Sequence, residues 1–338
     1  MKTTLRKIII FSMSVIFLAG CTQKKDVVIG ISLGPNQERW QKDLDLMTER
    51  LDYAGAKVLV KEAQNDETVQ AEQIEDLLKS NIDVLIIAPV NSETCGVIVN
   101  EAKQQYPDLK VIAYDRIIKN CDLDFYVSFD NIKVGELQAD YLTRIKPTGK
   151  YAILGGSPKD NNSQLLKLGQ MNILQPLITK GDITIVLDKF VADWNADNAY
   201  EIINNYLNQG KELDAIIASS DEIAKGASRA LEEHDLCRNV LLSGQDAQAD
   251  ACKRIAEGKQ TMTVYKYIES LAHSTANIAM LMAKDEPVPN SFVTMNNGEA
   301  MVPALLLPSM IQVHKGNIRM TVIADGYLDR KEVFGDEE

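Results

Sequence analysis

Charged and amide side chains follow several apolar segments of this sequence, each at the point where the segment ends. In VIAYDRII, residues 111–118, an apolar run is followed by two opposite charges, Asp115 and Arg116. Because the carboxyl ends of parallel strands open into one crevice, such residues are expected to gather around a ligand. The main residues at seven such strand ends are Arg39, Trp40, Asp115, Arg116, Asp160, Asn162, Trp194, Ser220, Asp246 and Lys266, with Asn161, Ser219, Asp221 and Gln245 beside them.

The residue types in this set suit a neutral polyol. Vicinal hydroxyls can bridge to one carboxylate or one guanidinium, and the C–H face of a pyranose can pack on an indole, which is large and apolar with one polar atom. Paired carboxylates could instead serve a glycosidase, but the Arg and Lys beside them would neutralise them. Each residue taken singly could also be a helix N-cap or a member of a surface ion pair.

Other catalytic patterns are missing from these strand ends. No His or Cys stands among them to form a nucleophile–base pair, and the sequence has no glycine-rich phosphate loop. The spacings of the cysteines fit no metal site, so we expect neither a metal nor a cofactor. Four cysteines, Cys95, Cys121, Cys237 and Cys252, allow three disulfide pairings, and the sequence leaves their oxidation state open.

Apolar strand patterns alternate with amphipathic helix patterns along most of the chain, which indicates parallel sheets covered on both faces. The strands are too many for one open sheet, so we expect an α/β fold of two doubly wound domains. The predicted strands cover residues 27–33, 57–60, 84–88, 111–114, 125–129, 151–154, 183–187, 215–218, 240–243 and 261–264. The predicted helices cover residues 40–54, 69–78, 93–105, 134–145, 165–174, 198–207, 223–232 and 271–282, with a short one between the last two strands.

The overall charge argues against one class of partner. The 338 residues include 36 Lys and Arg against 48 Asp and Glu, a formal net charge of −12. A nucleic-acid binder needs a basic face to displace counterions. We therefore expect no nucleic-acid partner.

The N-terminus has the pattern of a bacterial lipoprotein signal. Basic residues precede an apolar stretch, residues 8–18, that is too short to span a bilayer. The stretch ends in Leu18-Ala19-Gly20-Cys21, small residues before a cysteine, which resembles the lipobox. We expect residues 1–20 to be removed and Cys21 to be lipidated, with residues 21–25 as a short tether to the membrane outside the cytoplasm.

Motifs spread over the chain resemble those of one group of sugar receptors. They are ERWQKD, AYDR, DFYVSFDN, GGSPKDNN, GQM, SGQDA, TMTVYK and MNNG. Together they resemble the D-xylose-binding proteins of bacterial ABC transporters, within the ribose-type periplasmic binding proteins. The resemblance runs from about Asp26 to Phe334.

The resemblance implies the type I periplasmic binding protein fold, two Rossmann-like lobes joined by a three-segment hinge. The N-terminal lobe would comprise residues 26–130 and 267–296, and the C-terminal lobe residues 131–266 and 297–334. The chain would cross between the lobes near Asp130, Lys266 and Asn296-Asn297. The acidic tail, residues 335–338, is expected to be disordered.

The resemblance also implies which residues contact the sugar, with both tryptophans lining the pocket. One position departs from the family pattern, because Ser220 stands where an asparagine precedes the aspartate in the segment IASSD. This departure leaves another aldose, such as glucose or ribose, open beside D-xylose. The implied contact set is Arg39, Trp40, Asp115, Arg116, Asp160, Asn162, Trp194, Asp246 and Lys266.

The function expected from these observations is capture of an aldopyranose, D-xylose first, by closure of the two lobes and its delivery to an ABC permease. An alternative is a sensor that presents the liganded state to a membrane histidine kinase. An enzyme, a glycosidase or a sugar isomerase, would need a base or metal cluster that the sequence does not offer. We expect a monomer without catalytic activity.

Overall fold

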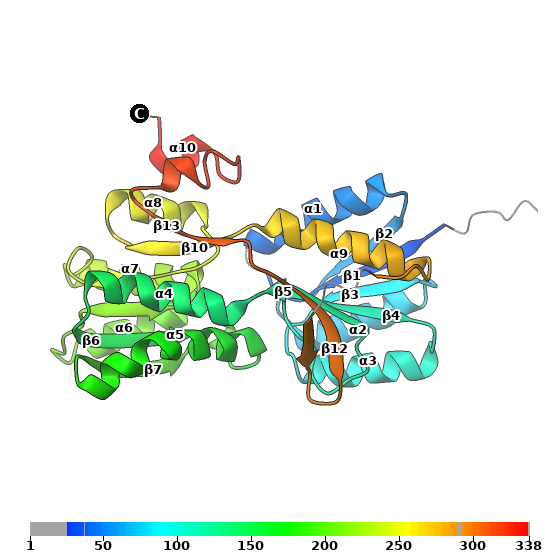
Figure 1. Cartoon of the computed structure of the whole chain (residues 1–338), viewed down its shortest axis with the longest axis horizontal. Coiled ribbons are helices and arrows are strands. Elements are labelled where there is room, and N and C mark those ends of the chain that lie inside the picture. The colour runs from blue at the N-terminus through cyan, green and yellow to red at the C-terminus, as the bar shows by residue number, and fades with distance from the viewer. Residues whose placement is uncertain (1–25, 37, 289–292, 337–338) are drawn as a thin grey trace, which may run out of the picture.

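The computed structural model describes residues 26–36, 38–288 and 293–336, which form two lobes side by side (Figure 1). The predicted signal peptide, Cys21, the tether and the last two residues of the acidic tail lie outside the described residues. The first lobe has a seven-stranded sheet of order β11-β12-β5-β4-β3-β1-β2, parallel except for β11. Its strands are β1 (Val28–Leu33), β2 (Lys57–Glu62), β3 (Val84–Ala88), β4 (Lys110–Tyr114), β5 (Phe125–Phe129), β11 (Val293–Asn296) and β12 (Met301–Leu307).

Helices cover both faces of this sheet. The helices α1 (Glu38–Tyr53) and α9 (Ile268–Ala283) pack on one face, and α2 (Glu67–Leu78) and α3 (Thr94–Gln105) pack on the other. In α1 the buried residues Leu44, Met47 and Leu51 recur at helical spacing. This spacing forms a single apolar stripe, so the helix lies on the sheet and its other side faces solvent.

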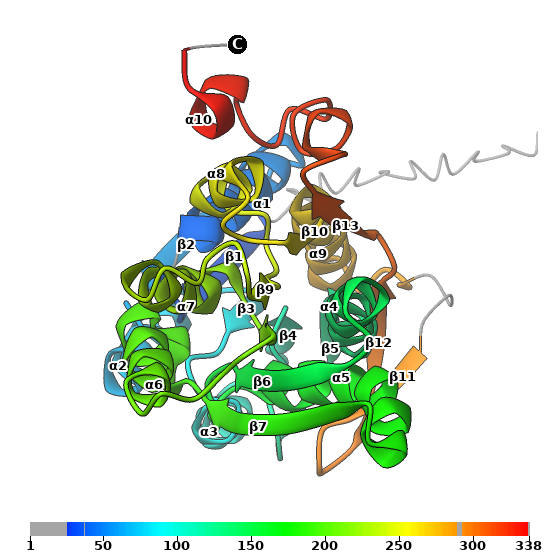
Figure 2. The same ribbon diagram turned by 90° about the vertical axis from the view of Figure 1, so that its left-hand side faces the viewer.

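The second lobe repeats this layered arrangement with a smaller sheet of order β7-β6-β8-β9 and an antiparallel pair, β10-β13. Figure 2 shows α4 and α5 on one side of this sheet, and α6 and α7 on the other. A parallel bridge between Gln245 and Val264 joins the loop after β9 to β10. The elements are α4 (Asn131–Ile145), β6 (Gly149–Gly155), α5 (Asn161–Lys180), β7 (Ile183–Phe190), α6 (Ala196–Leu207), β8 (Ala215–Ala218), α7 (Asp221–Glu233), β9 (Leu241–Leu242), α8 (Ala249–Glu257), β10 (Met262–Lys266), β13 (Met310–His314) and α10 (Arg330–Phe334).

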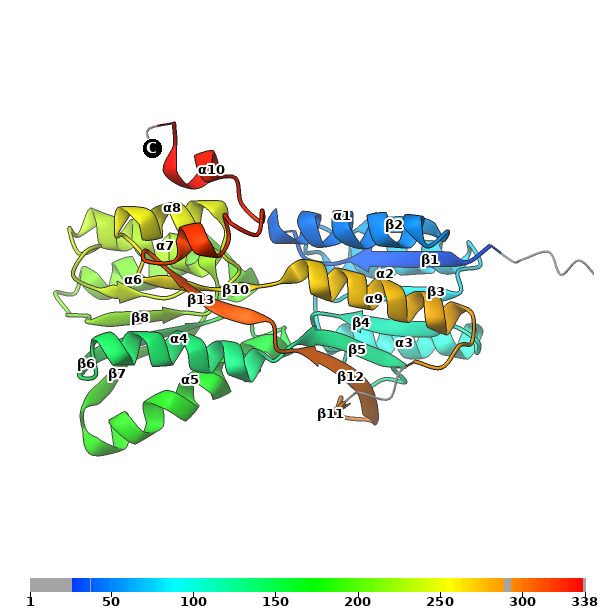
Figure 3. The same ribbon diagram turned by 45° about the horizontal axis from the view of Figure 1, so that its top comes forward.

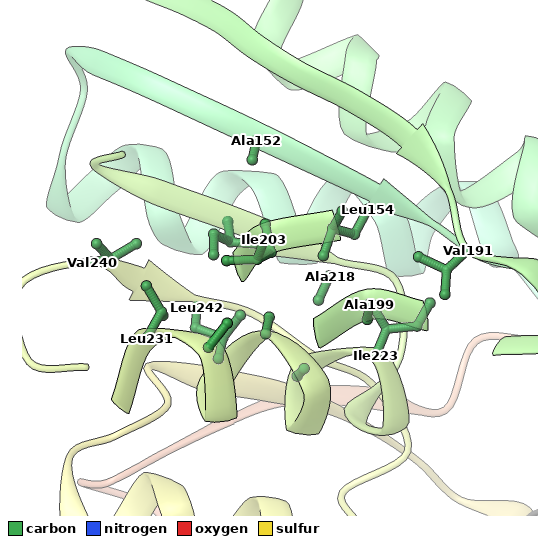
Figure 4. Packing of buried hydrophobic residues seen from close by; sticks show 14 of the residues in the cluster. Ala152, Leu154, Val191, Ala199, Ile203, Ala218, Ile223, Leu231, Val240 and Leu242 are labelled. Atoms are coloured by element: carbon green, nitrogen blue, oxygen red, sulfur yellow. The ribbon is translucent and has the colours of Figure 1, made fainter. Parts of the chain in front are cut away.

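The core of the second lobe lies between this sheet and its helices. In Figure 4, Leu154 of β6 and Leu242 of β9 lie opposite Ile203 of α6 and Ile223 of α7. All four side chains are fully buried. Burial of aliphatic side chains contributes roughly 1.5–3 kcal/mol each, so this core holds the strand ends of the lobe in fixed positions.

The chain crosses between the lobes between β5 and α4, between β10 and α9, and between β12 and β13 (Figure 3). The third crossing had been predicted at Asn296-Asn297, and this prediction is wrong. Strand β12 belongs to the first lobe, because it pairs with β5 from Ala304 opposite Tyr126 to Leu307 opposite Phe129. The crossing therefore lies between Leu307 and Met310, and residues 301–307 belong to the first lobe.

Every predicted strand and helix overlaps an observed one, and the predicted fold class is confirmed. Strands β11, β12 and β13 and helix α10 were not predicted. Strand β12 contains Pro303, which weakens a strand pattern because proline cannot donate to a ladder. Pro303 lies just before Ala304, where the pairing of β12 with β5 begins.

The described residues show the state of four cysteines and the character of the helices. Cys95, Cys121, Cys237 and Cys252 are all free thiols in this structure. Among the described helices, none combines the length and apolar character needed to span a membrane.

Candidate functional site

A cavity between the two lobes collects the residues that the sequence placed at strand ends. Together with its mouth, which opens to solvent, it encloses about 470 Å³ of space free of atoms. All ten residues of the predicted site line it, four from the first lobe and six from the second. They are Arg39, Trp40, Asp115, Arg116, Lys266, Asp160, Asn162, Trp194, Ser220 and Asp246, of which Lys266 stands at the hinge end of β10.

Arg39 is the centre of a buried charge network that joins the lobes. Its Nη2 atom lies 2.6 Å from a carboxylate oxygen of Asp115, and its Nε atom lies 3.1 Å from Asp43 on the next turn of α1. Its Nη1 atom lies 3.4 Å from Asp246, which belongs to the other lobe. Lys266 lies 3.0 Å from the same oxygen of Asp246. Buried ions need such partners, since an unpaired one costs several kcal/mol.

A second pair of contacts joins the lobes on the other side of the cavity. The Nε atom of Arg116 lies 2.8 Å from a carboxylate oxygen of Asp160. The side-chain amide of Asn162 donates to both the backbone carbonyl and the carboxylate of Asp115, at 3.1 Å each. Asp115 and Arg116 thus each bind a residue of the opposite lobe.

The charge network keeps Asp115 ionised. Burial raises the pKa of the Asp115 carboxyl, but Arg39, Lys266 and Arg116 outweigh burial and lower this pKa to about 2. For Asp160, burial is the larger effect and raises the pKa above its ordinary value, although Arg116 opposes it. The cavity therefore offers a carboxylate acceptor at Asp115 at any physiological pH.

Several cavity residues have strained backbones. Asp115 has φ +61°, Trp194 has φ +57° and Asp246 has φ +94°. Such values are uncommon outside glycine and cluster at functional sites. At Asp115 the conformation is held by its carbonyl, which accepts hydrogen bonds from the hydroxyls of Tyr126 and Ser128 at 3.0 and 2.7 Å.

The two tryptophans form apolar walls of the cavity. Trp40 lies in the first turn of α1, and the guanidinium groups of Arg39 and Arg116 lie 4.7 and 5.2 Å from its ring centroid. Trp194 ends a 3-10 turn after β7 and packs directly on the backbone of Gly156. A Cβ atom at Gly156 would lie only 2.1–2.3 Å from ring carbons of Trp194, so only glycine leaves room for the indole.

Two site residues also have the capping role that the sequence had left open. Asp160 accepts a hydrogen bond from the backbone N–H of Asn162 at the start of α5. The Ser220 hydroxyl accepts one from the N–H of Ile223 at the start of α7. Capping and cavity lining coincide here, because the strand that ends at the cavity leads directly into the helix.

A buried carboxylate behind the cavity positions the loop that carries Asp246. Asp221, the first residue of α7, accepts hydrogen bonds from the backbone N–H of Gln248, the Gln260 amide and the Thr263 hydroxyl at 3.0, 2.9 and 2.9 Å. Its own N–H donates to the carbonyl of Gln245 at 2.9 Å. Asp221 therefore ties the loop after β9 to both α7 and β10.

We expect Asp221 to make stability depend on pH. Burial raises the pKa of this carboxyl from 3.8 to about 8, although Arg254 and Gln260 oppose the increase. A raised folded-state pKa means that the folded state binds the proton more tightly. The stabilisation is complete below about pH 4 and is lost as pH rises through about 8. The free energy of unfolding in urea should therefore fall less between pH 6 and pH 9 in Asp221→Asn than in the unmodified protein.

The exposed Asp52 supplies a control for this comparison. Asp52→Asn should leave the wild-type decrease between pH 6 and pH 9 unchanged. A decrease of equal size in all three proteins would contradict a role for Asp221 in the pH response.

The structure adds three residues to the cavity lining: Glu222, Gln245 and Gln248. Gln245 stands at a predicted strand end but outside the predicted contact set. Glu222 lies in the first turn of α7, and Gln248 precedes α8. No strand pattern ends at these two positions, so only the three-dimensional arrangement of the two helices could reveal them.

Further contacts join the lobes at the rim of the cavity. Lys159 of the second lobe pairs with Glu67 of the first at 2.7 Å, and its carbonyl accepts a hydrogen bond from the N–H of Ser92 at 3.0 Å. Glu67 is itself held by the hydroxyl of Thr94 and the amide of Asn91. These contacts can form only while the lobes approach each other.

The arrangement is suited to holding a polyhydroxylated molecule. Three cations, several carboxylates and side-chain amides present fixed donors and acceptors, and two indoles present apolar faces. Among the residues that the structure describes, no group of three or more His, Cys, Asp or Glu side chains could hold a metal ion.

Comparison with known proteins gives consistent matches over nearly the whole chain. The family model described as periplasmic binding protein domain matches residues 29–287. A protein of Haemophilus influenzae named D-xylose-binding periplasmic protein is 47% identical over 312 residues, which are 92% of this chain and 93% of that protein. A protein of Escherichia coli with the same name is 45% identical over 311 residues, covering 91% and 93%.

A solved structure provides a comparison of the fold. It is an ABC transporter solute binding protein from Clostridium phytofermentans with bound β-D-glucose, 26% identical, with a TM-score of 0.83. The match covers 90% of this chain and 99% of that one. The agreement extends over both lobes.

Proposed function

Because this chain belongs to the periplasmic binding protein family, we propose that it captures an aldopyranose, most specifically D-xylose, outside the cytoplasm and delivers it to an ABC permease. The observation that carries this proposal is the cavity that both lobes line with Asp115, Asn162, Asp246 and two indoles. The two relatives named as D-xylose-binding proteins favour xylose over other aldoses.

Cleft closure would couple binding to delivery. Asp115 contacts Arg39 within the first lobe and Asn162 in the second. A sugar that binds residues from both lobes therefore stabilises the arrangement in which the lobes meet. The permease would then recognise the surfaces that closure brings together.

Tryptophan emission offers a test of which sugar fits. The chain has two tryptophans, and both line the cavity. Since indole emission depends on the surroundings of the ring, D-xylose should shift the emission in a saturable way at lower concentration than D-glucose or D-ribose. A preference for D-glucose would keep the sugar class and overturn the choice of xylose. D-Glucose is included because a solved structure of similar fold contains bound β-D-glucose.

We also propose a lipid anchor at Cys21, on the basis of Leu18-Ala19-Gly20-Cys21 after a short apolar stretch. Cys21→Ser should abolish acylation and release the protein from the membrane fraction. A variant that stays in the membrane fraction and still carries lipid would place the anchor elsewhere.

The protein is proposed to act as a monomer and without catalysis. The Asp115 carboxyl, with its pKa of about 2, would be a poor general acid. Sedimentation at increasing concentration would reveal a dimer, and release of products from xylosides would reveal an enzyme.

A further inference from the structure

Buried side-chain atoms without a hydrogen-bond partner gather at the cavity. Among the described residues, six side-chain nitrogen or oxygen atoms are buried and unpartnered, and three of them belong to cavity residues. These three are Oδ1 of Asn162, Oε1 of Gln245 and Nε1 of Trp194, of which the last lies beside the Asp160 carboxyl and interacts with it. Because an unpaired buried polar atom is costly, those of the six that line the cavity are positions where a ligand can supply the missing partner.

Gln245 is the member of this group that lies outside the predicted contact set. Gln245 is only 5% exposed to solvent. Its backbone is fixed, since its carbonyl accepts a hydrogen bond from the N–H of Asp221 at 2.9 Å and the residue bridges to Val264. The side chain is therefore held beside the cavity by the same support that positions Asp246.

Two acceptors of the second lobe near Gln245, the Ser220 hydroxyl and Oδ1 of Asp246, are already engaged. The hydroxyl oxygen of Ser220 accepts from the N–H of Ile223 at 3.2 Å. The Oδ1 atom of Asp246 lies within 3.4 Å of Arg39 and 3.0 Å of Lys266. The amide oxygen of Gln245 is an acceptor on this wall with its hydrogen-bonding capacity unused.

We propose that Gln245 is a specificity-determining residue of this cavity, whose Oε1 atom accepts a hydrogen bond from one hydroxyl of the bound sugar. The inference rests on the proposed function and adds a residue to it. A sugar that lacks this hydroxyl, or has it in the opposite configuration, leaves Oε1 unpaired and binds less tightly.

The test pairs protein variants with sugar variants. Gln245→Met keeps the length of the side chain and removes the amide. Calorimetric titration with D-xylose should then show affinity lowered by roughly 5- to 100-fold, the range expected for a lost hydrogen bond in a buried site. The monodeoxy xyloses should include one that binds the unmodified protein weakly and loses no further affinity in Gln245→Met.

Gln73→Met is a matched control. Gln73 has an unpartnered side-chain oxygen like that of Gln245, but it lies on α2 outside the cavity. This variant should bind every sugar as the unmodified protein does. Gln245→Glu keeps the shape of the side chain and an acceptor oxygen, so it should retain the discrimination among deoxy sugars even if Gln245→Met fails to fold.

Two results would overturn the inference. The first is unchanged affinity in Gln245→Met, and the second is equal weakening of D-xylose and all its deoxy analogues, which would indicate a structural effect of the substitution. An unmodified protein that binds none of D-xylose, D-glucose and D-ribose would instead overturn the proposed function, so the two failures are distinguishable.

Discussion

Asp115→Ala is expected to weaken sugar binding by about 30-fold or more while the protein remains folded. The substitution removes the nearest partner of Arg39, at 2.6 Å, and one of the two acceptors of the Asn162 amide. Arg39 is buried and keeps only its more distant partners, Asp43 at 3.1 Å and Asp246 at 3.4 Å, in a site that the sugar must also desolvate. Truncating one partner of a buried charged pair costs about 2–5 kcal/mol, and 2 kcal/mol corresponds to roughly 30-fold. Calorimetric titration with D-xylose would measure the loss.

Asp115→Asn separates charge from shape in the same measurement. Asparagine tolerates the left-handed backbone that Asp115 adopts, and its side-chain oxygen can still accept from Arg39. Its affinity should fall between those of the unmodified protein and Asp115→Ala. Near-normal affinity in Asp115→Ala would mean that Asp115 and Arg39 form a structural ion pair that does not contact the ligand.

Gly156→Ala is expected to weaken binding by about tenfold or more through Trp194. The new Cβ atom would lie 2.1–2.3 Å from carbons of the indole, far inside van der Waals contact. Either the indole leaves its place on the cavity wall or the backbone that directly follows β6 shifts. A nucleobase stacked on an aromatic side chain contributes about 1–3 kcal/mol, roughly 5- to 150-fold in affinity, and by analogy we expect a similar contribution from the sugar face on this indole. A displaced indole should lose most of this contribution.

A double-mutant cycle checks the route of this effect. In Trp194→Ala the clash is absent, so adding Gly156→Ala should lower sugar affinity little further. Fully additive losses would show that Gly156 acts independently of the indole. Normal affinity in Gly156→Ala would mean that Trp194 has room to move without loss of binding.

Most of the candidate site could be predicted because its residues stand at strand ends. In a parallel sheet the carboxyl ends of the strands meet at one edge, so Asp160 and Ser220 could be placed together from the strand pattern of one lobe. Asp115 ends a strand in the sheet of the other lobe, and it was the resemblance to two-lobed sugar receptors that implied that the two edges face each other. The structure brings all ten predicted residues around one cavity. Their contact with a sugar remains a prediction.

The parts that could not be predicted depend on long-range pairing. Strand β12 pairs with β5 although about 175 residues separate them, and no local pattern indicates which lobe it joins. The proline in this strand and the exposed Met301 at its start further weaken its pattern. The predicted lobe boundary at residues 296–297 failed for this reason.

The hydrogen bonds of Asp221 that position the cavity loop also could not be predicted from the sequence. The fully buried Asp221 reads in the sequence as an ordinary residue at the start of a helix, where a carboxylate is favoured. Its bonds to Gln248, Gln260 and Thr263 come from segments 27 to 42 residues away. Only the folded chain shows that it holds the loop that carries Gln245 and Asp246.

The central claim is that the cavity between the lobes binds an aldopyranose. Calorimetric titration of the mature chain with D-xylose tests this claim most directly. D-Xylose should bind saturably, with one sugar per chain, and its binding should be abolished or strongly weakened in Asp115→Ala. Titration without detectable binding of D-xylose, D-glucose or D-ribose by a folded protein would contradict it.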